Sequence, residues 1–300
     1  MPLTVVILTL NEELHIARAL TSVASIAEKC VIVDSGSTDR TVEIAQGMGA
    51  QVLTNPFVTQ AQQFNWALEQ LPPGTDWILR LDADEIVSKS LAQEIVAKLD
   101  RVPAHIHGMR LSRRMNFLGQ PVRRGGLFPI RLVRLLRHNH GRSEDRWMDE
   151  HIIVDGEVGD FSGEIVDDNL NSLTWWTHKH NNYASREVVE MLNLEHGFMA
   201  RGEGGDADHA GGTGAKRWIK ENLYARLPGG LRAIAYFLYR YVVRLGFLDT
   251  REGQMFHVLQ GFWYRYLVDA KLREVQTYMK DNDTDAVAAI MEVTGIDVRA

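Results

Sequence analysis

Residues 76–85 read DWILRLDADE, a short apolar run followed directly by three acidic side chains. The apolar part, DWILRL, is typical of a buried β-strand. Carboxylates gathered after such a strand repel one another, at a cost of about 1 kcal/mol each where they are partly exposed. Folding alone gives no reason to gather them, so this junction indicates a strand end that binds a ligand.

The residues before this stretch alternate between strand and helix patterns. Apolar, β-branched runs predict strands at residues 3–10, 30–34 and 50–54. Apolar residues at helical spacing predict helices at residues 12–24, 41–48, 60–71 and 88–99. This alternation is the pattern of a mostly parallel sheet covered by helices on both faces, an α/β fold. Such sheets bind ligands at the carboxyl ends of their strands.

Two further predicted strands also end in acidic and small polar residues. The first is followed by TLNEE at residues 9–13, and the second by DSGSTD at residues 34–39. Because the carboxyl ends of parallel strands meet at one edge of a sheet, we expect these residues to lie beside Asp82 and Asp84. Mg²⁺ and Mn²⁺ prefer hard oxygen ligands and usually take one or two carboxylates together with substrate phosphates. The edge is therefore a candidate site for a divalent metal ion and the phosphates of a substrate.

Each segment also has an interpretation without a ligand. Asp82 and Asp84 alone can form an exposed turn with a helix N-cap. Residues 34–37 can simply cap the following helix, and residues 11–13 can begin a helix, whose positive dipole end favours acids. The occurrence of all three segments at strand ends favours a metal site over these separate explanations.

In this order and spacing, residues 9–12 (TLNE), 34–39 (DSGSTD) and 82–85 (DADE) resemble the signature of glycosyltransferase family 2. The resemblance is strong over residues 1–115 and looser as far as residue 200. It implies the GT-A fold, a Rossmann-like domain that binds a nucleotide-sugar on a mostly parallel sheet. We expect a C-terminal helical region to follow this domain.

The resemblance also implies roles for individual residues. The base and ribose of the donor would contact the loops after the first two strands, at Thr9, Asn11, Glu12, Asp34, Ser35 and Gly36. Asp84 would be the main metal ligand, and Asp82 would lie near the ribose and the metal. The metal, Mg²⁺ or Mn²⁺, would bridge the diphosphate of the donor.

Four other positions correspond to contacts that the family makes. Gln62, Asn65 and Arg80 fall where the family contacts the base or the sugar. Gln62 and Asn65 can equally be solvated residues of a helix. Asp168 stands where many relatives have a metal-binding histidine, so it is our candidate for the third metal ligand.

Sugar transfer also needs a base, because the acceptor hydroxyl must lose a proton. The family uses an Asp or Glu after the metal-binding acids, commonly in an acidic pair. Residues 147–151 read WMDEH and are the best match, with Glu150 favoured and Asp149 second. The alternative is a charged loop in an already acidic stretch. Family members invert the anomeric configuration by direct attack, so no covalent nucleophile is expected.

The rest of the chain is predicted to change character. Residues 105–112 and 130–136 read as strands, 150–158 as a further candidate strand, and 173–199 as a helix. We expect a GT-A domain at residues 1–200, a flexible glycine-rich loop at 201–215 and a helical region at 216–300.

Two segments of the helical region, residues 236–247 and 256–270, mix large aromatic residues with arginine. Such helices suit a membrane interface, where aromatic rings lie at the headgroup level and arginine meets anionic lipid. The alternative is a helical core or a dimer interface. Trp175, Trp176 and His180 lie in a segment that resembles the lipopolysaccharide and exopolysaccharide branch of the family, whose acceptors are often lipid-linked sugars.

Composition limits the remaining possibilities. The chain has 300 residues and a net charge of −6, which argues against a general nucleic-acid binder. Its single cysteine fits a reducing compartment. The run at residues 3–10 lacks the basic flank of a signal peptide, and no stretch reaches the roughly 18 apolar residues of a spanning helix. We therefore expect a cytoplasmic protein with peripheral contact at the cytoplasmic face of the membrane.

These observations predict an inverting glycosyltransferase that acts on a saccharide or a lipid-linked saccharide in cell-surface polysaccharide or lipopolysaccharide synthesis. UDP is the default donor nucleotide, because it is the commonest one in the family. One alternative is a nucleotidyltransferase that makes a nucleotide-sugar, although the glycine-rich basic loop of that class is missing after the first strand. The other is an inactive sugar-nucleotide binder that acts as a membrane scaffold.

Overall fold

The computed structural model describes residues 3–72, 74–144, 151–199 and 230–298. The chain divides into two units. The first contains Met1–Arg123 and Leu127–Leu170, and the second contains Arg124–Gly126 and Asn171–Ala300. We expected the first domain to extend to residue 200. The observed division falls earlier, because the helix that follows residue 172 packs on the C-terminal helices. The predicted loop at residues 201–215 lies outside the described residues.

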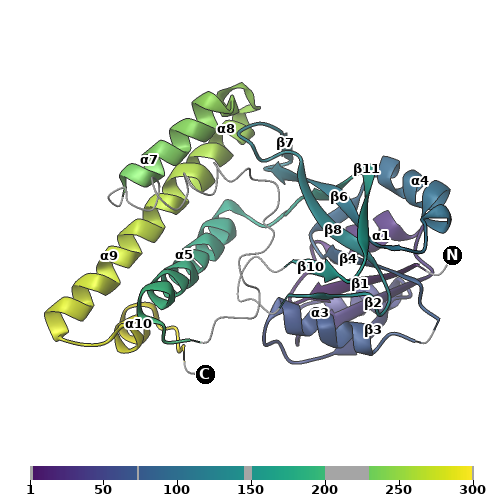
Figure 1. Cartoon of the computed structure of the whole chain (residues 1–300), viewed down its shortest axis with the longest axis horizontal. Coiled ribbons are helices and arrows are strands. Elements are labelled where there is room, and N and C mark those ends of the chain that lie inside the picture. Colours follow the sequence, from purple (N-terminus) through teal and green to yellow (C-terminus); the bar gives the residue numbers. More distant parts are fainter. Residues whose placement is uncertain (1–2, 73, 145–150, 200–229, 299–300) are drawn as a thin grey trace. The chain divides into compact units, whose positions relative to one another are not determined.

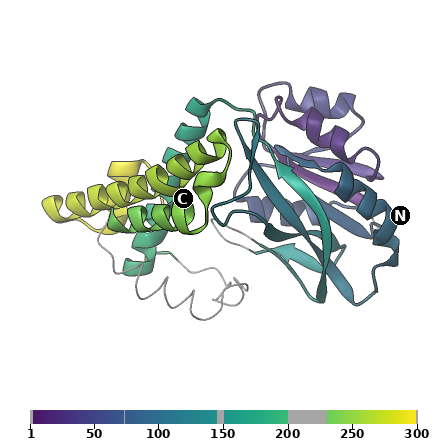
Figure 2. The same ribbon diagram turned by 90° about the horizontal axis from the view of Figure 1, so that it is seen from above.

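The first unit is built on one nine-stranded sheet with the order β3-β2-β1-β4-β8-β6-β11-β5, in which β7 pairs with β6 (Figures 1 and 2). Its strands are β1 (Leu3–Thr9), β2 (Lys29–Asp34), β3 (Gln51–Thr54), β4 (Trp77–Asp82), β5 (Glu85–Val87), β6 (Ile106–Phe117), β7 (Gln120–Val122), β8 (Ile130–Arg137) and β11 (Glu157–Asp167). A separate two-stranded hairpin consists of β9 (Gly141–Ser143) and β10 (Ile152–Val154). The helices of this unit are α1 (Ile16–Val23), α2 (Thr41–Gly47), α3 (Gln60–Glu69) and α4 (Lys89–Lys98).

Four neighbouring strands, β3, β2, β1 and β4, are parallel, as the alternation of strand and helix patterns predicts. In the register of these strands Thr9 pairs with Asp34, and Leu8 pairs with Asp82. The three predicted acidic strand ends therefore meet at one edge of the sheet. The predicted fold class, an α/β domain with a mostly parallel sheet followed by helices, is confirmed.

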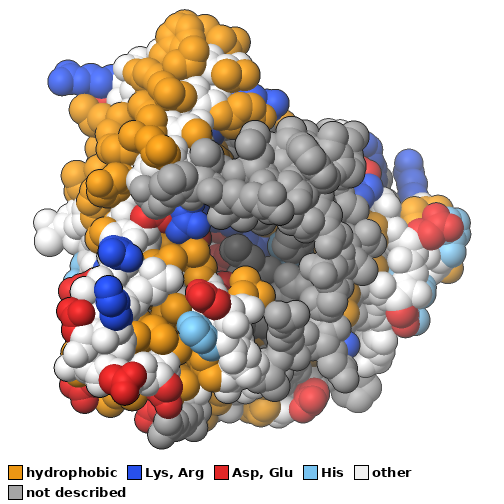
Figure 3. All heavy atoms as spheres, turned by 60° about the vertical axis from the view of Figure 1, so that its left-hand side comes forward, with side chains coloured by type: hydrophobic (Ala, Val, Ile, Leu, Met, Phe, Trp, Pro, Cys, Tyr) orange, Lys and Arg blue, Asp and Glu red, His pale blue; other side chains and the backbone are white. Residues whose placement is uncertain are grey.

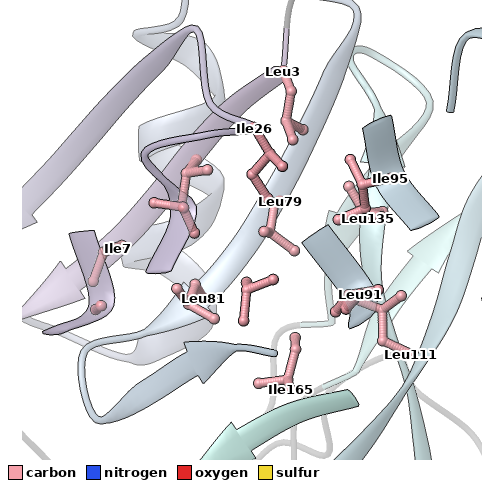
Figure 4. Packing of buried hydrophobic residues seen from close by; sticks show 14 of the residues in the cluster. Leu3, Ile7, Ile26, Leu79, Leu81, Leu91, Ile95, Leu111, Leu135 and Ile165 are labelled. Carbon is pink, nitrogen blue, oxygen red and sulfur yellow. The ribbon is translucent and has the colours of Figure 1, made fainter. Parts of the chain in front are cut away.

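Alternate residues of each central strand face opposite layers of helices. Leu3 and Ile7 of β1 pack with α1 and α4 in one core (Figure 4). Val6 points to the other face, where Phe64 of α3 fills a second core. Strands buried on both faces read as continuous apolar runs, which is why the β1 sequence LTVVILT lacks alternation.

Strand β11 was not predicted. The sequence indicated a candidate strand at residues 150–158, whereas the structure has the short β10 and then the start of β11 there. β11 pairs with β6 in parallel and with β5 in antiparallel orientation. Its last residue, Asp167, pairs with Glu85 and so lies at the same sheet edge as Asp82.

The described part of the second unit is helical, as predicted. Its helices are α5 (Leu173–His196), α7 (Leu231–Leu238), α8 (Arg251–Val258), α9 (Tyr264–Asn282) and α10 (Ala286–Thr294), with π-helical segments at Tyr239–Val243 and Leu259–Trp263. Buried residues of α5, such as Val188, pack against Val268 of α9 and Ile290 of α10. Among the described residues, no helix is both long enough and apolar enough to cross a membrane.

The packing of α4 gives a test of the core. Ile95 is fully buried, whereas its neighbour Val96 has 62% of its surface exposed. Ile95→Ala should lower the free energy of unfolding by about 2–5 kcal/mol, because it leaves a cavity between α4 and the sheet. Val96→Ala should change it by less than about 0.5 kcal/mol. Urea denaturation followed by circular dichroism measures both, and equal effects would contradict this packing.

Candidate active site

The loops after β1 and β2 are joined through the buried carboxylate of Asp34. Thr9 Oγ1 donates to Asp34 Oδ1 at 2.9 Å, and the backbone N–H groups of Gly36 and Ser37 donate to Asp34 Oδ2 at 2.9 and 2.8 Å. Burial raises the pKa of Asp34, but the hydrogen bonds from Ser37, Thr9 and Gly36 outweigh it and hold the pKa below its ordinary value. Asp34 is thus an ionised residue that shapes the loop after β2.

A second set of hydrogen bonds closes these two loops against each other. The N–H of Asn11 donates to Ser37 Oγ at 2.9 Å, and Asn11 Oδ1 accepts from the N–H of Thr38 at 2.8 Å. The N–H of Glu12 donates to Thr41 Oγ1 at 2.7 Å. Asn11 has a φ of 57°, a left-handed conformation that asparagine tolerates better than most residues.

Helix α3 contributes a residue that the sequence interpretation missed. Buried Gln63 donates from Nε2 to Ser35 Oγ at 3.1 Å, and its Oε1 accepts from Asn55 at 2.7 Å. The predicted residue Gln62, one position earlier on the helix, is exposed. A shift of one position on a helix turns a side chain by about 100°, so the sequence signal alone did not distinguish the two glutamines.

Asn65 has a structural role that was also not predicted. Its side chain donates to the carbonyl of Ser143 at 3.0 Å and accepts from the N–H of Ser143 at 2.8 Å. It therefore fixes α3 to the β9–β10 hairpin. The backbone N–H of Glu144 donates to the carbonyl of His151 at 2.8 Å, which closes the hairpin. The predicted base residues Asp149 and Glu150 fall between these two positions and lie outside the described residues.

At the end of β4, one arginine holds two carboxylates. Buried Arg134 of β8 donates to Asp82 Oδ2 and to Glu85 Oε1, both at 2.9 Å. The N–H of Asp82 donates to the other oxygen of Glu85 at 3.0 Å. Arg80, which was predicted, lies 3.8 Å from Asp82 Oδ1 and 5.3 Å from the ring centroid of Phe64.

These acids differ in their tendency to ionise. Burial raises the pKa of Asp82, but the positive charges of Arg134 and Arg80 outweigh it and hold the pKa well below its usual range. Burial raises the pKa of Glu85 to about 7, and the negative charge of Asp82 adds to this effect against the attraction of Arg134. Burial also raises the pKa of Asp167. Asp82 is therefore ionised at neutral pH, whereas Glu85 titrates near neutrality.

Asp84 lies beside the segment that follows β11. Its Oδ2 accepts from the side-chain amide of Asn169 at 2.9 Å, and its carbonyl accepts from the N–H of Asp168 at 3.0 Å. Among the described residues, none forms an ion pair with Asp84. The Asp168 carboxylate accepts from Arg18 at 2.8 Å and from Asn116 at 3.0 Å. Asp168 therefore lies next to Asp84, as predicted, but its oxygens already have partners.

The oxygen donors at this edge fit a hard divalent cation. Asp84 offers a carboxylate that forms no ion pair with an arginine among the described residues. Magnesium sites typically use only one or two carboxylates and complete the shell with phosphate oxygens and water. Asp82 is held by Arg134, so Asp84 is the better placed of the two ligands.

Comparison with known proteins shows similarity to glycosyltransferases over part of the chain. Residues 4–148 match the model described as glycosyl transferase family 2. The chain is 33% identical over 165 residues to the lipopolysaccharide core biosynthesis glycosyltransferase LpsC of Rhizobium meliloti, covering 53% of this chain and 60% of that protein. It is 45% identical over 89 residues to an uncharacterized glycosyltransferase of Rickettsia bellii, covering 30% of each chain. The chain therefore spans less than two thirds of the length of these relatives.

Among solved structures, glucosyl-3-phosphoglycerate synthase from Mycobacterium tuberculosis is similar to part of this chain. The complex of that enzyme with Mn²⁺, uridine diphosphate and glucosyl-3-phosphoglycerate aligns with a TM-score of 0.33 and 23% sequence identity. The alignment covers 38% of this chain and 44% of that one.

The elevated pKa of Glu85 makes stability depend on pH. Folding raises this pKa from 4.5 to about 7, so between these values the folded chain keeps a proton that the unfolded chain has lost. The contribution of Glu85 to the free energy of unfolding therefore falls as the pH rises through this range, by at most about 1.4 kcal/mol per pH unit. Glu85→Gln, which stays neutral, should show a shallower decline.

Urea denaturation between about pH 5 and pH 8 measures this slope. Glu28→Gln, at an exposed glutamate of the same unit, is the control and should follow the wild-type curve. If the Glu85→Gln curve runs parallel to the wild type throughout, Glu85 does not titrate in this range.

Proposed function

Because residues 4–148 match the model described as glycosyl transferase family 2, we propose that the chain is an inverting glycosyltransferase that uses a nucleotide-diphosphate sugar as donor. The observation that carries this proposal is the convergence of three strand ends. The Thr9 and Asp34 loops are hydrogen-bonded to each other, and Asp82 is one strand away in the sheet register. Together they offer polar groups for a nucleoside beside carboxylates for a metal-bound diphosphate.

The donor nucleotide would bind along the two joined loops. Thr9 and Asp34 form their floor, while Asn11 and Glu12 line the exposed rim. Ser35, Gly36 and buried Arg80 complete the set that the family resemblance predicts. UDP is the proposed nucleotide because it is the commonest in the family.

We propose that Asp84 binds Mg²⁺ or Mn²⁺, with Asp82 near the ion and Asp168 as the third ligand. The backbone hydrogen bond from Asp168 to the carbonyl of Asp84 supports this choice, because it keeps the two residues next to each other. When bound, the cation neutralises charge that develops on the diphosphate leaving group. Arg134 keeps Asp82 ionised and correctly oriented for this purpose.

The acceptor is proposed to be a saccharide or a lipid-linked saccharide of lipopolysaccharide type. The similarity to LpsC, whose name assigns it to lipopolysaccharide core biosynthesis, supports this class. Glu150 is the proposed base that removes the proton of the acceptor hydroxyl, with Asp149 as the second choice. Both residues lie between Glu144 and His151 in the sequence, and these two described residues are joined by a backbone hydrogen bond.

Replacement of the main metal ligand tests the function. Asp84→Asn keeps the size of the side chain but removes its charge, so transfer from a UDP-sugar should fall by at least about 100-fold, as expected when a group that stabilises transition-state charge is lost. The stabilisation of the protein by Mn²⁺ together with UDP, measured by thermal shift, should also disappear. Asp76→Asn, at the opposite end of β4, is the matched control and should retain both properties.

A panel of nucleotide-sugars with Mn²⁺ distinguishes this function from the alternatives. Donor consumption with release of the nucleoside diphosphate supports the transferase. Release of pyrophosphate from a nucleoside triphosphate would instead identify a nucleotidyltransferase, and donor binding without consumption would identify an inactive binder.

We also propose that the second unit contacts a membrane surface peripherally. Large apolar side chains on α7, α8 and their connection are exposed (Figure 3). This apolar surface consists of Leu231, Ile234, Leu238, Tyr239, Val242, Val243, Leu245, Phe247, Leu248, Met255 and Val258. Leu231, Ile234 and Leu238 recur at helical spacing, so one face of α7 is apolar and turned to solvent.

The charge of this segment favours an anionic lipid surface as the partner. Residues 231–248 contain no Asp or Glu and three arginines. Exposed Arg244 lies among the apolar side chains, and exposed Arg251 follows them at the start of α8. Apolar side chains with neighbouring arginines are typical of helices that lie in the headgroup region of a bilayer.

Vesicle flotation tests the membrane contact. The wild-type protein should float with vesicles that contain anionic phosphatidylglycerol and should bind less to neutral phosphatidylcholine vesicles or at high salt. The double variant Leu238→Glu/Val242→Glu should lose binding, whereas Val96→Glu, at an exposed valine of the first unit, should bind like the wild type. Flotation of the double variant at the wild-type level would rule out this surface. A shift from dimer to monomer in light scattering would indicate a second copy as the partner instead.

A further inference from the structure

Three potential metal ligands lie at the opposite edge of the sheet from the strand-end acids. The side-chain ligand atoms of His107, His140 and Asp155 all lie within 4.8 Å of one another. His107 is near the start of β6, beside the residues of β8 that pair with the first residues of β4. The group is therefore separated from Asp82 by the length of a strand, and it takes no part in the proposed donor site.

The three side chains converge on one oxygen. The Nδ1 atoms of His107 and His140 lie 2.6 and 3.1 Å from Oδ1 of Asp155, and the centroids of the two imidazole rings are 3.9 Å apart. Around a tetrahedral zinc ion with bonds of about 2.0–2.1 Å, neighbouring ligand atoms are roughly 3.3 Å apart. Small rotations of the side chains would therefore bring all three ligand atoms to a common ion.

The backbone holds these ligands in position. The N–H of Asp155 donates to the carbonyl of His140 at 3.0 Å, directly after the pairing of β9 with β10. A Cβ atom at Gly156 would lie 2.3 Å from Nδ1 of His107. Only glycine at position 156 therefore leaves room for this imidazole beside Asp155.

Hydrogen bonds alone contribute little to holding these three side chains together. The side chains of His140 and Asp155 are 42% and 62% exposed, so water competes for every contact. Exposed ion pairs contribute little to stability, because ordering the side chains that form them offsets most of the attraction. Binding of a metal ion would stabilise the same arrangement of side chains much more strongly.

We propose that His107, His140 and Asp155 bind a Zn²⁺-type transition-metal ion through two imidazole nitrogens and one carboxylate oxygen. Nitrogen ligands select zinc, cobalt or nickel, whereas the all-oxygen site at Asp84 suits Mg²⁺ or Mn²⁺. Water fills the fourth position, because the group is open to solvent. The ion fastens the two ends of the β9–β10 hairpin to β6 and so stabilises the pairing of β9 with β10.

Cobalt binding tests the site without any assay of transfer. The full-length protein is stripped with a chelator, given excess Mg²⁺ to fill the oxygen site, and titrated with Co²⁺. The wild type should bind one Co²⁺ with the visible absorption of a four-coordinate nitrogen-containing site, and Zn²⁺ should displace it. His140→Ala and Asp155→Asn should each weaken binding by more than about 100-fold, which exceeds the usual effect of replacing an outer-shell residue.

A control variant and a measurement of thermal stability complete the cobalt-binding experiment. His105→Ala removes an exposed histidine two residues from His107 and should bind Co²⁺ like the wild type. Zn²⁺ should also raise the unfolding temperature of the wild type and of Asp84→Asn, but not that of His140→Ala. The proposal fails if the wild type shows no such absorption, or if His140→Ala and Asp155→Asn bind as tightly as the wild type. Because Asp84→Asn removes only the oxygen site, failure here is distinguishable from failure of the transferase proposal.

Discussion

The guanidinium group of Arg134 makes the acidic edge of the sheet possible. Four carboxylates, those of Asp82, Asp84, Glu85 and Asp167, come together there because β4 and β11 end and β5 begins at the same place. Arg134 neutralises two of them and is itself almost fully buried. Breaking such a buried pair leaves an uncompensated charge, which typically costs about 3–5 kcal/mol. The proposed metal-binding edge thus depends on a positive charge that the protein supplies itself.

The sequence predicted the parts of the chain in which local pattern and tertiary environment agree. The runs that became β1, β2 and β4 are buried on both faces, so their apolar character is continuous and easy to recognise. Their acidic ends stood out because nothing in a buried strand requires them. The order of the predicted strands and helices was therefore sufficient to predict that these acidic residues meet at one edge of the sheet.

Other features depend on contacts between distant residues. β11 contains Asp160 and two glycines and lacks an apolar run, yet Asp160 pairs with Arg110 and Arg131 of neighbouring strands. A Cβ atom at Gly163 would lie 2.4 Å from the backbone of Leu91, so this glycine is required by the packing of α4. The role of Arg134 was not predicted for a similar reason, since its partners are far from it in the sequence. Such residues are recognised only when the register of the sheet is known.

The hydrogen bonds that join the loops after β1 and β2 have a thermodynamic consequence. Asn11, Ser37 and Thr38 fix the rim of the proposed nucleoside site before any ligand binds. Binding of a ligand is normally weakened when flexible segments of the protein must be immobilised. In this protein the rim has already been immobilised during folding, so recognition of base and ribose can proceed with little further loss of backbone entropy, and its selectivity reflects the shape of a rigid receptor.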